Sequence, residues 1–91
     1  MNDLLIESAK LGLLPVVKKL IEQGANVNTD DDLALRLAAY NGYLEMVKYL
    51  VSQGANVSAR GDYAIGLAAR SGHLEIVKYL KSLGGNGLKL I

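Results

Sequence analysis

The chain has 91 residues, 51% apolar and 21% charged, with a formal net charge of +1. This length makes one domain, and the balanced charge lacks the basic footprint of nucleic-acid-binding proteins. No cysteine is present, which removes thiolate chemistry and fits a reducing compartment. The N-terminus is acidic and no apolar run approaches the ~20 residues of a membrane helix, so we expect neither a secretory signal nor a membrane partner.

A short motif returns every thirty residues along the chain. The segment 24–27 reads Gly-Ala-Asn-Val, the segment 54–57 is identical to it, and 84–87 is an altered copy, Gly-Gly-Asn-Gly. A fixed period of this length indicates one supersecondary unit stacked on copies of itself. We therefore divide the single domain, residues 1–91, into repeats of about 1–30, 31–60 and 61–91. Stacked units offer an extended surface rather than a closed pocket, which favours a binding function.

Within each repeat the apolar residues follow two short helical periods separated by a glycine. In the middle repeat, Leu35, Ala38 and Ala39 lie on one face of a first helix, and Gly42 can end that helix in a left-handed conformation. The six helices predicted in this way cover residues 3–11, 14–22, 33–41, 44–52, 63–71 and 74–82. No substantial sheet is predicted.

The second helix of each repeat carries a regular apolar stripe. In the middle repeat this stripe consists of Leu44, Val47 and Leu50. Because the middle repeat has a neighbour on each side, we expect these three side chains to be the most deeply buried of the chain.

A longer motif joins the two helices of a repeat. The segment 68–80 reads Ala-Ala-Arg-Ser-Gly-His-Leu-Glu-Ile-Val-Lys-Tyr-Leu, and the segment 38–47 follows the same pattern one period earlier. This pattern resembles the ankyrin repeat, and the resemblance recurs in register over nearly the whole chain. It implies an all-α solenoid of three stacked helix-turn-helix units.

Two features depart from the usual ankyrin pattern. The period is 30 residues here, against roughly 33 in the family, and the shortfall lies between Asn26 and Leu35 and again between Asn56 and Ile65. The family's Thr-Pro-Leu-His tetrapeptide is also replaced, so we expect shortened turns between repeats. This short form is similar to ankyrin repeats of giant amoeba-infecting viruses, and a designed or reconstructed repeat protein is the alternative. We expect an intracellular, cytoplasmic protein, in the host cytoplasm if viral.

Residues that could carry out chemistry are sparse. His73 is the single histidine, whereas a zinc site or a catalytic triad needs several converging groups, so we interpret it as a packing residue. Asp30, Asp31 and Asp32 lack the spacing of a calcium loop, and we interpret them as a solvated turn before a helix. The sequence therefore predicts no enzyme, no metal and no cofactor.

Three lysines and two tyrosines recur in register on the second helices: Lys18, Lys48, Lys78, Tyr49 and Tyr79. The last two lysines each follow a glutamate by three residues, which predicts ion pairs on a solvated face. An anion-binding stripe is the alternative. For the tyrosines, partner contact and plain packing are both open.

The ankyrin resemblance implies a partner-binding groove formed by the turns and the ends of the first helices. The residues expected to line it vary between repeats and include the Tyr and Arg types that are common at binding hot spots. They are Lys10, Asp30, Asp32, Tyr40, Asn41, Arg60, Asp62, Tyr63, Arg70 and Ser71. The leading hypothesis is therefore a non-enzymatic scaffold that binds another protein.

The alternative hypothesis is a structural or self-associating unit. The C-terminal end carries Leu83, Leu88, Leu90 and Ile91, with no fourth repeat to cover them. Uncovered apolar patches favour association. This reading predicts a weak homodimer through the C-terminal end, or a segment excised from a longer array.

Overall fold

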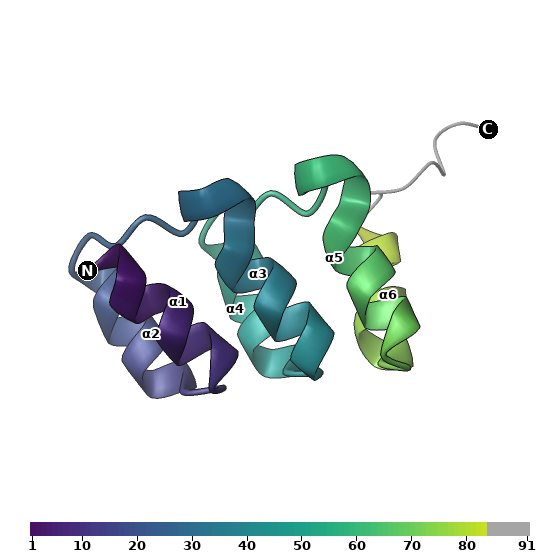
Figure 1. The fold of residues 1–91 in the computed structure, drawn as a ribbon, viewed down its shortest axis with the longest axis horizontal. Coiled ribbons are helices and arrows are strands. Elements are labelled where there is room, and N and C mark those ends of the chain that lie inside the picture. Colours follow the sequence, from purple (N-terminus) through teal and green to yellow (C-terminus); the bar gives the residue numbers. More distant parts are fainter. Residues whose placement is uncertain (84–91) are drawn as a thin grey trace.

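In the computed structural model, residues 1–83 are described, and they form six α-helices arranged in three helical hairpins (Figure 1). In chain order the helices are α1 (Asn2–Lys10), α2 (Leu14–Glu22), α3 (Thr29–Asn41), α4 (Leu44–Ser52), α5 (Ala59–Arg70) and α6 (Leu74–Ser82). The first helices α1, α3 and α5 pack side by side in one layer, and the second helices lie behind them. Residues 1–83 contain no strand, and the predicted all-α solenoid of three helix-turn-helix units is confirmed.

The three second helices have the predicted bounds, because an apolar stripe and flanking glycines mark both of their ends. The first helices α3 and α5 begin at Thr29 and Ala59, four residues before the predicted starts at 33 and 63. The added residues do not extend the right-handed helix. They form a separate turn that is continuous with it.

This added turn is left-handed. Asp30, Asp31 and Asp32 have φ angles of 53°, 57° and 61°, with ψ between 41° and 48°. Residues 60–62 adopt the same conformation, with φ angles of 55°, 69° and 65°. Left-handed conformation costs roughly 1–2 kcal/mol for an L-residue with a Cβ, although aspartate tolerates it better than most. Three consecutive residues of this kind therefore need support from their surroundings.

The two left-handed turns are supported in different ways. In the middle repeat, the Arg36 guanidinium donates from Nε to the Asp31 carbonyl at 3.0 Å and from Nη2 to the Asp30 carbonyl at 2.8 Å. In the third repeat the residue equivalent to Arg36 is Gly66, which has no side chain to bind the turn. The central residue of this turn is Gly61, which adopts a left-handed conformation at little steric cost because it has no Cβ. The short inter-repeat connection is thus a structured turn rather than a solvated loop.

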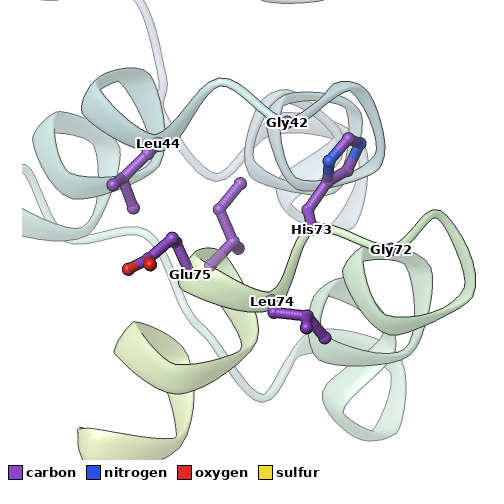
Figure 2. A pocket seen from close by; sticks show the side chains of 7 residues that line it. Gly42, Leu44, Gly72, His73, Leu74 and Glu75 are labelled. Carbon is purple, nitrogen blue, oxygen red and sulfur yellow. The ribbon is translucent and has the colours of Figure 1, made fainter.

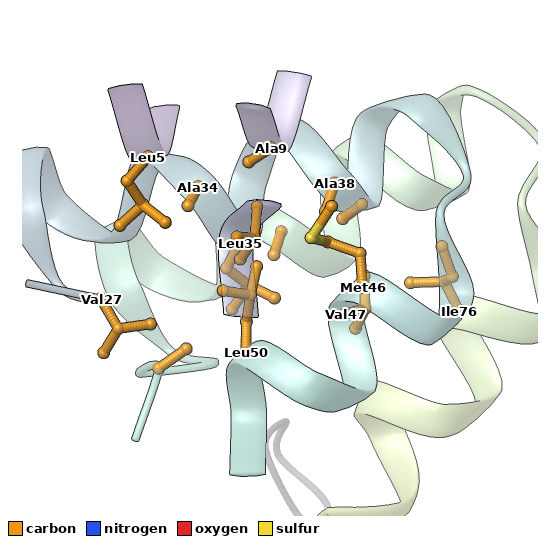
Figure 3. Packing of buried hydrophobic residues seen from close by; sticks show 14 of the residues in the cluster. Leu5, Ala9, Val27, Ala34, Leu35, Ala38, Met46, Val47, Leu50 and Ile76 are labelled. Atoms are coloured by element: carbon orange, nitrogen blue, oxygen red, sulfur yellow. The ribbon is translucent and has the colours of Figure 1, made fainter. Parts of the chain in front are cut away.

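A continuous aliphatic core fills the space between the two helical layers (Figure 3). The large side chains with the lowest exposure come from five of the six helices: Leu5, Val17, Leu35, Met46, Val47, Leu50, Ile76 and Leu80. Because each hairpin buries its apolar face against the next, the core belongs to the stack rather than to any single repeat.

Of the three middle-repeat residues that we expected to be the most buried, two are fully buried in the structure. Val47 and Leu50 are fully buried, whereas Leu44 is only half-buried, and Met46 is 2% exposed in its place. The residue equivalent to Met46 in the first repeat is Val16, which is 43% exposed. This position therefore faces the preceding repeat, and its burial depends on a neighbour that helical periodicity alone does not reveal.

Leu50→Ala is expected to lower the free energy of unfolding by about 2–5 kcal/mol, because a fully buried leucine leaves a cavity when truncated. The matched control is Leu74→Ala, since Leu74 is 66% exposed and its truncation should change stability by less than about 0.5 kcal/mol. Urea unfolding followed by circular dichroism measures both. A loss below ~1 kcal/mol at Leu50 would contradict the core described here.

The left-handed turn predicts opposite effects for two glycines of α5. Gly61 has a φ of 69° and Gly66 lies in right-handed helix, and at neither would a Cβ meet an atom within 4 Å. Gly61→Ala should therefore cost about 1–2 kcal/mol from backbone strain alone, and Gly66→Ala should stabilise by about 0.5–1 kcal/mol. The same unfolding experiment compares them. Stabilisation by both substitutions would show that residue 61 is not left-handed.

Candidate protein-binding surfaces

The ten predicted contact residues fall into two groups at opposite ends of the first helices. The turn group consists of Asp30, Asp32, Arg60, Asp62 and Tyr63, and the helix-end group consists of Lys10, Tyr40, Asn41, Arg70 and Ser71. Tyr63 and Arg70 mark the two ends on α5, and seven residues of helix place them about 10 Å apart. The structure therefore brings each group together at its own end of the first-helix layer.

In the turn group, the Tyr63 ring is flanked by two arginines. The guanidinium carbons of Arg36 and Arg60 lie 5.7 and 5.9 Å from the ring centroid. Arg60 Nη1 also lies 3.9 Å from a carboxylate oxygen of Asp31, with both side chains largely exposed. Tyr63 itself is 42% exposed, so an aromatic ring of fixed orientation is presented to solvent. Arg36 and Asp31 were not predicted here, since their places depend on the left-handed turn.

Asp32 is a structural residue of the turn. Its side chain is 5% exposed, and its Oδ1 accepts hydrogen bonds from Asn28 Nδ2 at 2.8 Å and from the Asn56 backbone N–H at 3.0 Å. The second bond joins the middle repeat to the turn that follows it. This burial leaves Asp32 outside the contact surface that we propose below. Asp62 stands in the same register and is half-buried.

In the helix-end group, the side chains differ in how accessible they are. Tyr40 is 51% exposed, and Lys10 and Arg70 are exposed as well. Asn41 is half-buried, and its Nδ2 donates to the Leu37 carbonyl at 3.0 Å. Tyr40, Lys10 and Arg70 occupy equivalent positions of the three repeats, so together they form one row across α1, α3 and α5.

A half-buried apolar row lies beside these polar groups on the first-helix layer. Leu33 and Leu37 of α3 precede Tyr40 by seven and three residues, which places all three on one helical face. On α5 the equivalent positions are Tyr63, Leu67 and Arg70. Periodicity marked none of these leucines as a contact residue, because half-buried and fully buried leucines have the same helical spacing.

Two rings hold successive repeats together at the helix ends. Tyr43 lies against Gly12, and His73 lies against Gly42, so closely that a Cβ on either glycine would come within 2.9 and 2.6 Å of ring atoms. His73 Nε2 is also 3.0 Å from the Tyr40 carbonyl. His73 therefore packs between the middle and third repeats, as predicted for a packing residue.

An open cavity of about 390 Å³ lies at the junction between the middle and third repeats (Figure 2). It is lined by Gly42, Leu44, Gly72, His73, Leu74, Glu75 and Ile76. Its apolar walls come from Leu44, Leu74 and Ile76, and the His73 ring turns toward Gly42 in Figure 2. The cavity was not predicted from the sequence.

Two of the three recurring lysines, Lys18 and Lys48, contact tyrosine rings. The predicted ion pairs of Lys48 and Lys78 with the glutamate three residues earlier are wrong. Lys18 Nζ lies 5.5 Å from the Tyr49 ring centroid and Lys48 Nζ lies 5.7 Å from that of Tyr79, so each contact crosses a repeat boundary. The ion pair found within residues 1–83 is that of Arg60 with Asp31. Burial raises the pKa of Tyr49, and the Glu22 carboxylate raises it further.

Among residues 1–83, no helix is both long enough and apolar enough to span a bilayer. In the same part of the chain, no three His, Asp or Glu side chains converge as metal ligands would. The features that the surface does offer are exposed aromatic rings, arginines and half-buried leucines.

Comparison with known families agrees with this architecture. A family model described as ankyrin repeats (three copies) matches residues 5–88. The chain belongs to the ankyrin repeat family. Ankyrin repeats are generally protein–protein interaction modules and are typically non-enzymatic. A search of curated proteins gave no match, and the viral or designed origin of this ankyrin domain stays a prediction.

Within the ankyrin domain, Asp32→Ala is expected to lower the free energy of unfolding by about 1–3 kcal/mol, because it leaves two donors without their acceptor. Asp30→Ala is the matched control, since Asp30 is an exposed residue of the same left-handed turn. Alanine tolerates that backbone less well than aspartate at both positions, so this cost is common to the two variants and the lost hydrogen bonds are not. Thermal and urea unfolding compare the two variants. Equal effects would mean that Asp32 does not join the repeats.

Proposed function

We propose that the chain is a non-enzymatic scaffold that binds a partner protein through the exposed face of its first helices. The observation that supports this most directly is the row of Lys10, Tyr40 and Arg70 beside half-buried leucines. Interface hot spots combine aromatic or arginine anchors with apolar surroundings that exclude water. The first-helix layer offers that combination.

The exposed Tyr63 ring is suited to act as an anchor because its neighbours restrict it. Tyr63 is held between Arg36 and Arg60, and a tyrosine of fixed orientation loses little entropy on binding. Tyr40 follows half-buried Leu37 on the same helical face. A partner that covers both rings would have to span the length of the first helices.

The size of the domain is sufficient for such a contact. A partner of ordinary size covers about 800 Å² on each side of an interface, and the accessible surface of the chain is 4980 Å². The turns beside this row carry both charges, with Arg60 Nη1 3.9 Å from an Asp31 carboxylate oxygen, and such a surface suits a protein of mixed charge rather than a polyanion.

The self-associating alternative keeps one supporting observation. Leu83 is 42% exposed at the end of α6. The other residues of that proposal, Leu88, Leu90 and Ile91, lie outside the described residues. The weak C-terminal homodimer therefore stays a prediction.

Tyr40→Ala and Arg70→Ala are each expected to weaken binding of a protein partner by about 1–3 kcal/mol, since truncating a hot-spot anchor leaves its pocket unfilled. Because both side chains are exposed, the free energy of unfolding should change by less than about 0.5 kcal/mol. Calorimetric titration measures binding, and Glu45→Ala on the second-helix layer is the control. A partner footprint confined to Lys18, Lys48 and Lys78 would contradict the proposal.

A further inference from the structure

The first repeat presents an apolar surface at the N-terminal end of the solenoid. Within residues 1–83, no other helix lies on the outer side of α1 and α2 (Figure 1). The large apolar side chains that are exposed there, between 43% and 59%, are Leu4, Leu11, Leu13 and Val16. We call these four residues the N-terminal face. The outer end of a repeat array is ordinarily polar, and an exposed apolar patch of this kind marks an interaction site.

In the middle repeat, the positions equivalent to this face are buried against the first repeat. Ala34 stands where the first repeat has Leu4, and it is fully buried. Met46 stands where the first repeat has Val16, and it is 2% exposed. The N-terminal face therefore lies on the side of the hairpin that is covered by protein elsewhere in the chain.

The N-terminal face does not suit another ankyrin repeat. Leu4 is larger than Ala34, which lies in the contact between α1 and α3, and a larger side chain in a closely packed contact forces the backbones apart. Lys19 stands where Tyr49 takes the ammonium group of the preceding repeat, and a lysine cannot make that cation–π contact. The face keeps an apolar surface but lacks the residues with which the repeats stack.

Side chains of opposite charge border the face on its two helices. Glu7 of α1 is exposed, and it follows Leu4 by three residues and precedes Leu11 by four, which makes it a neighbour of both. Lys19 of α2 is exposed, and it follows Val16 by three residues. The α1 border is therefore acidic and the α2 border is basic.

These charges lie at matching heights along the hairpin. Because α1 and α2 are antiparallel, the start of α1 at Asn2 and the end of α2 at Glu22 lie at the same end. Asp3 and Glu7 are one and five residues from that end, and both are exposed, whereas Lys19 is three residues from it. At 1.5 Å per residue, Lys19 stands at about 4.5 Å, level with the midpoint of the two carboxylates.

A two-fold axis parallel to the helices makes this face complementary to itself. Such an axis lays α1 of one chain against α2 of the other and leaves every residue at its own height. Lys19 of each chain then meets Asp3 and Glu7 of the other, so the charge contact forms twice, as in any isologous pair. The facing helices run antiparallel, as neighbours do in a four-helix bundle.

We propose that the N-terminal face is the contact surface of a two-fold homodimer. Its centre is the apolar face of each chain, and its two borders are the contacts of Lys19 with Asp3 and Glu7. The smaller dimensions of the molecule, across the solenoid, are 22 and 18 Å. The interface is therefore at the small end of the range for specific complexes, and the dimer exchanges with monomer.

The dimer has a consequence for how partners are brought together. Because the two-fold axis exchanges the first-helix and second-helix sides of the contact, the two first-helix surfaces face opposite sides of the dimer. One dimer then joins two partner molecules. This consequence rests on the proposed function, whereas the dimer itself does not.

Sedimentation equilibrium of the full chain tests the dimer. We expect the average mass to rise from the monomer value of 9.7 kDa toward twice that value as the concentration increases from micromolar to millimolar. Leu13→Glu should raise the dissociation constant at least about tenfold, equivalent to ~1.4 kcal/mol. Leu83→Glu, at the opposite end of the solenoid, is the matched control and should leave it unchanged. A chain that stays monomeric throughout, or a dimer lost only with Leu83→Glu, would overturn the proposal.

A charge exchange tests the arrangement of the two chains. Lys19→Glu places like charges at both borders, and so does the double variant Asp3→Lys with Glu7→Lys. Each variant alone should associate at least about tenfold more weakly than the parent chain. An equimolar mixture should associate about as tightly as the parent, because both borders then join opposite charges. Circular dichroism checks that the variants fold. A mixture that stays monomeric, or a variant that dimerises unchanged alone, would overturn the proposal.

A lipid surface is the other candidate occupant of the N-terminal face. If lipid covers it, the chain will stay monomeric and will co-sediment with vesicles of phosphatidylcholine and phosphatidylserine, and Leu13→Glu will release it. That result would overturn the proposal. None of these results bears on partner binding by the first-helix surface, which Tyr40→Ala and Arg70→Ala test separately.

Discussion

Three consecutive left-handed residues between the repeats are the constraint on which the rest of the structure depends. The turn at residues 30–32 brings the chain from the end of one hairpin into the first helix of the next within a few residues, and the turn at 60–62 does the same. This compact connection accounts for the thirty-residue period. Its backbone strain is offset in two ways, by the Arg36 guanidinium on two carbonyls in one turn and by Gly61 in the other.

The same turns position the surface that we propose as functional. They place Asp32 beneath the following turn, where its carboxylate accepts the Asn56 N–H, and they bring Arg60 and Arg36 to the Tyr63 ring. A longer connection would separate these groups. The exposed first-helix face is thus a consequence of how the repeats are joined, and the ring-on-glycine contacts at the opposite end fix the spacing of the first helices there.

Much of the fold could be predicted from the sequence, but only where a local pattern decides the structure. The second helices have their predicted bounds because apolar spacing and glycine mark them directly. The left-handed turn was missed because an aspartate run suits a right-handed helix N-terminus equally well. Met46 is buried where Leu44 was expected to be, because it packs against the neighbouring repeat. Lys48 likewise contacts Tyr79 of the neighbouring repeat rather than the glutamate of its own helix. Tyr40 and Arg70 are exposed, as expected for contact residues. The burial of Asp32 was not predicted, because it depends on a hydrogen bond to the turn of the following repeat.

The most direct test of this account is the intraresidue HN–Hα cross-peak intensity in a nuclear Overhauser spectrum of the free chain. A positive φ shortens that distance, so the account predicts strong cross-peaks at Asp30, Asp31, Asp32, Arg60 and Asp62 and weak ones throughout α4. Weak cross-peaks at the five turn residues would show a right-handed backbone there. The thirty-residue repeat would then need another explanation.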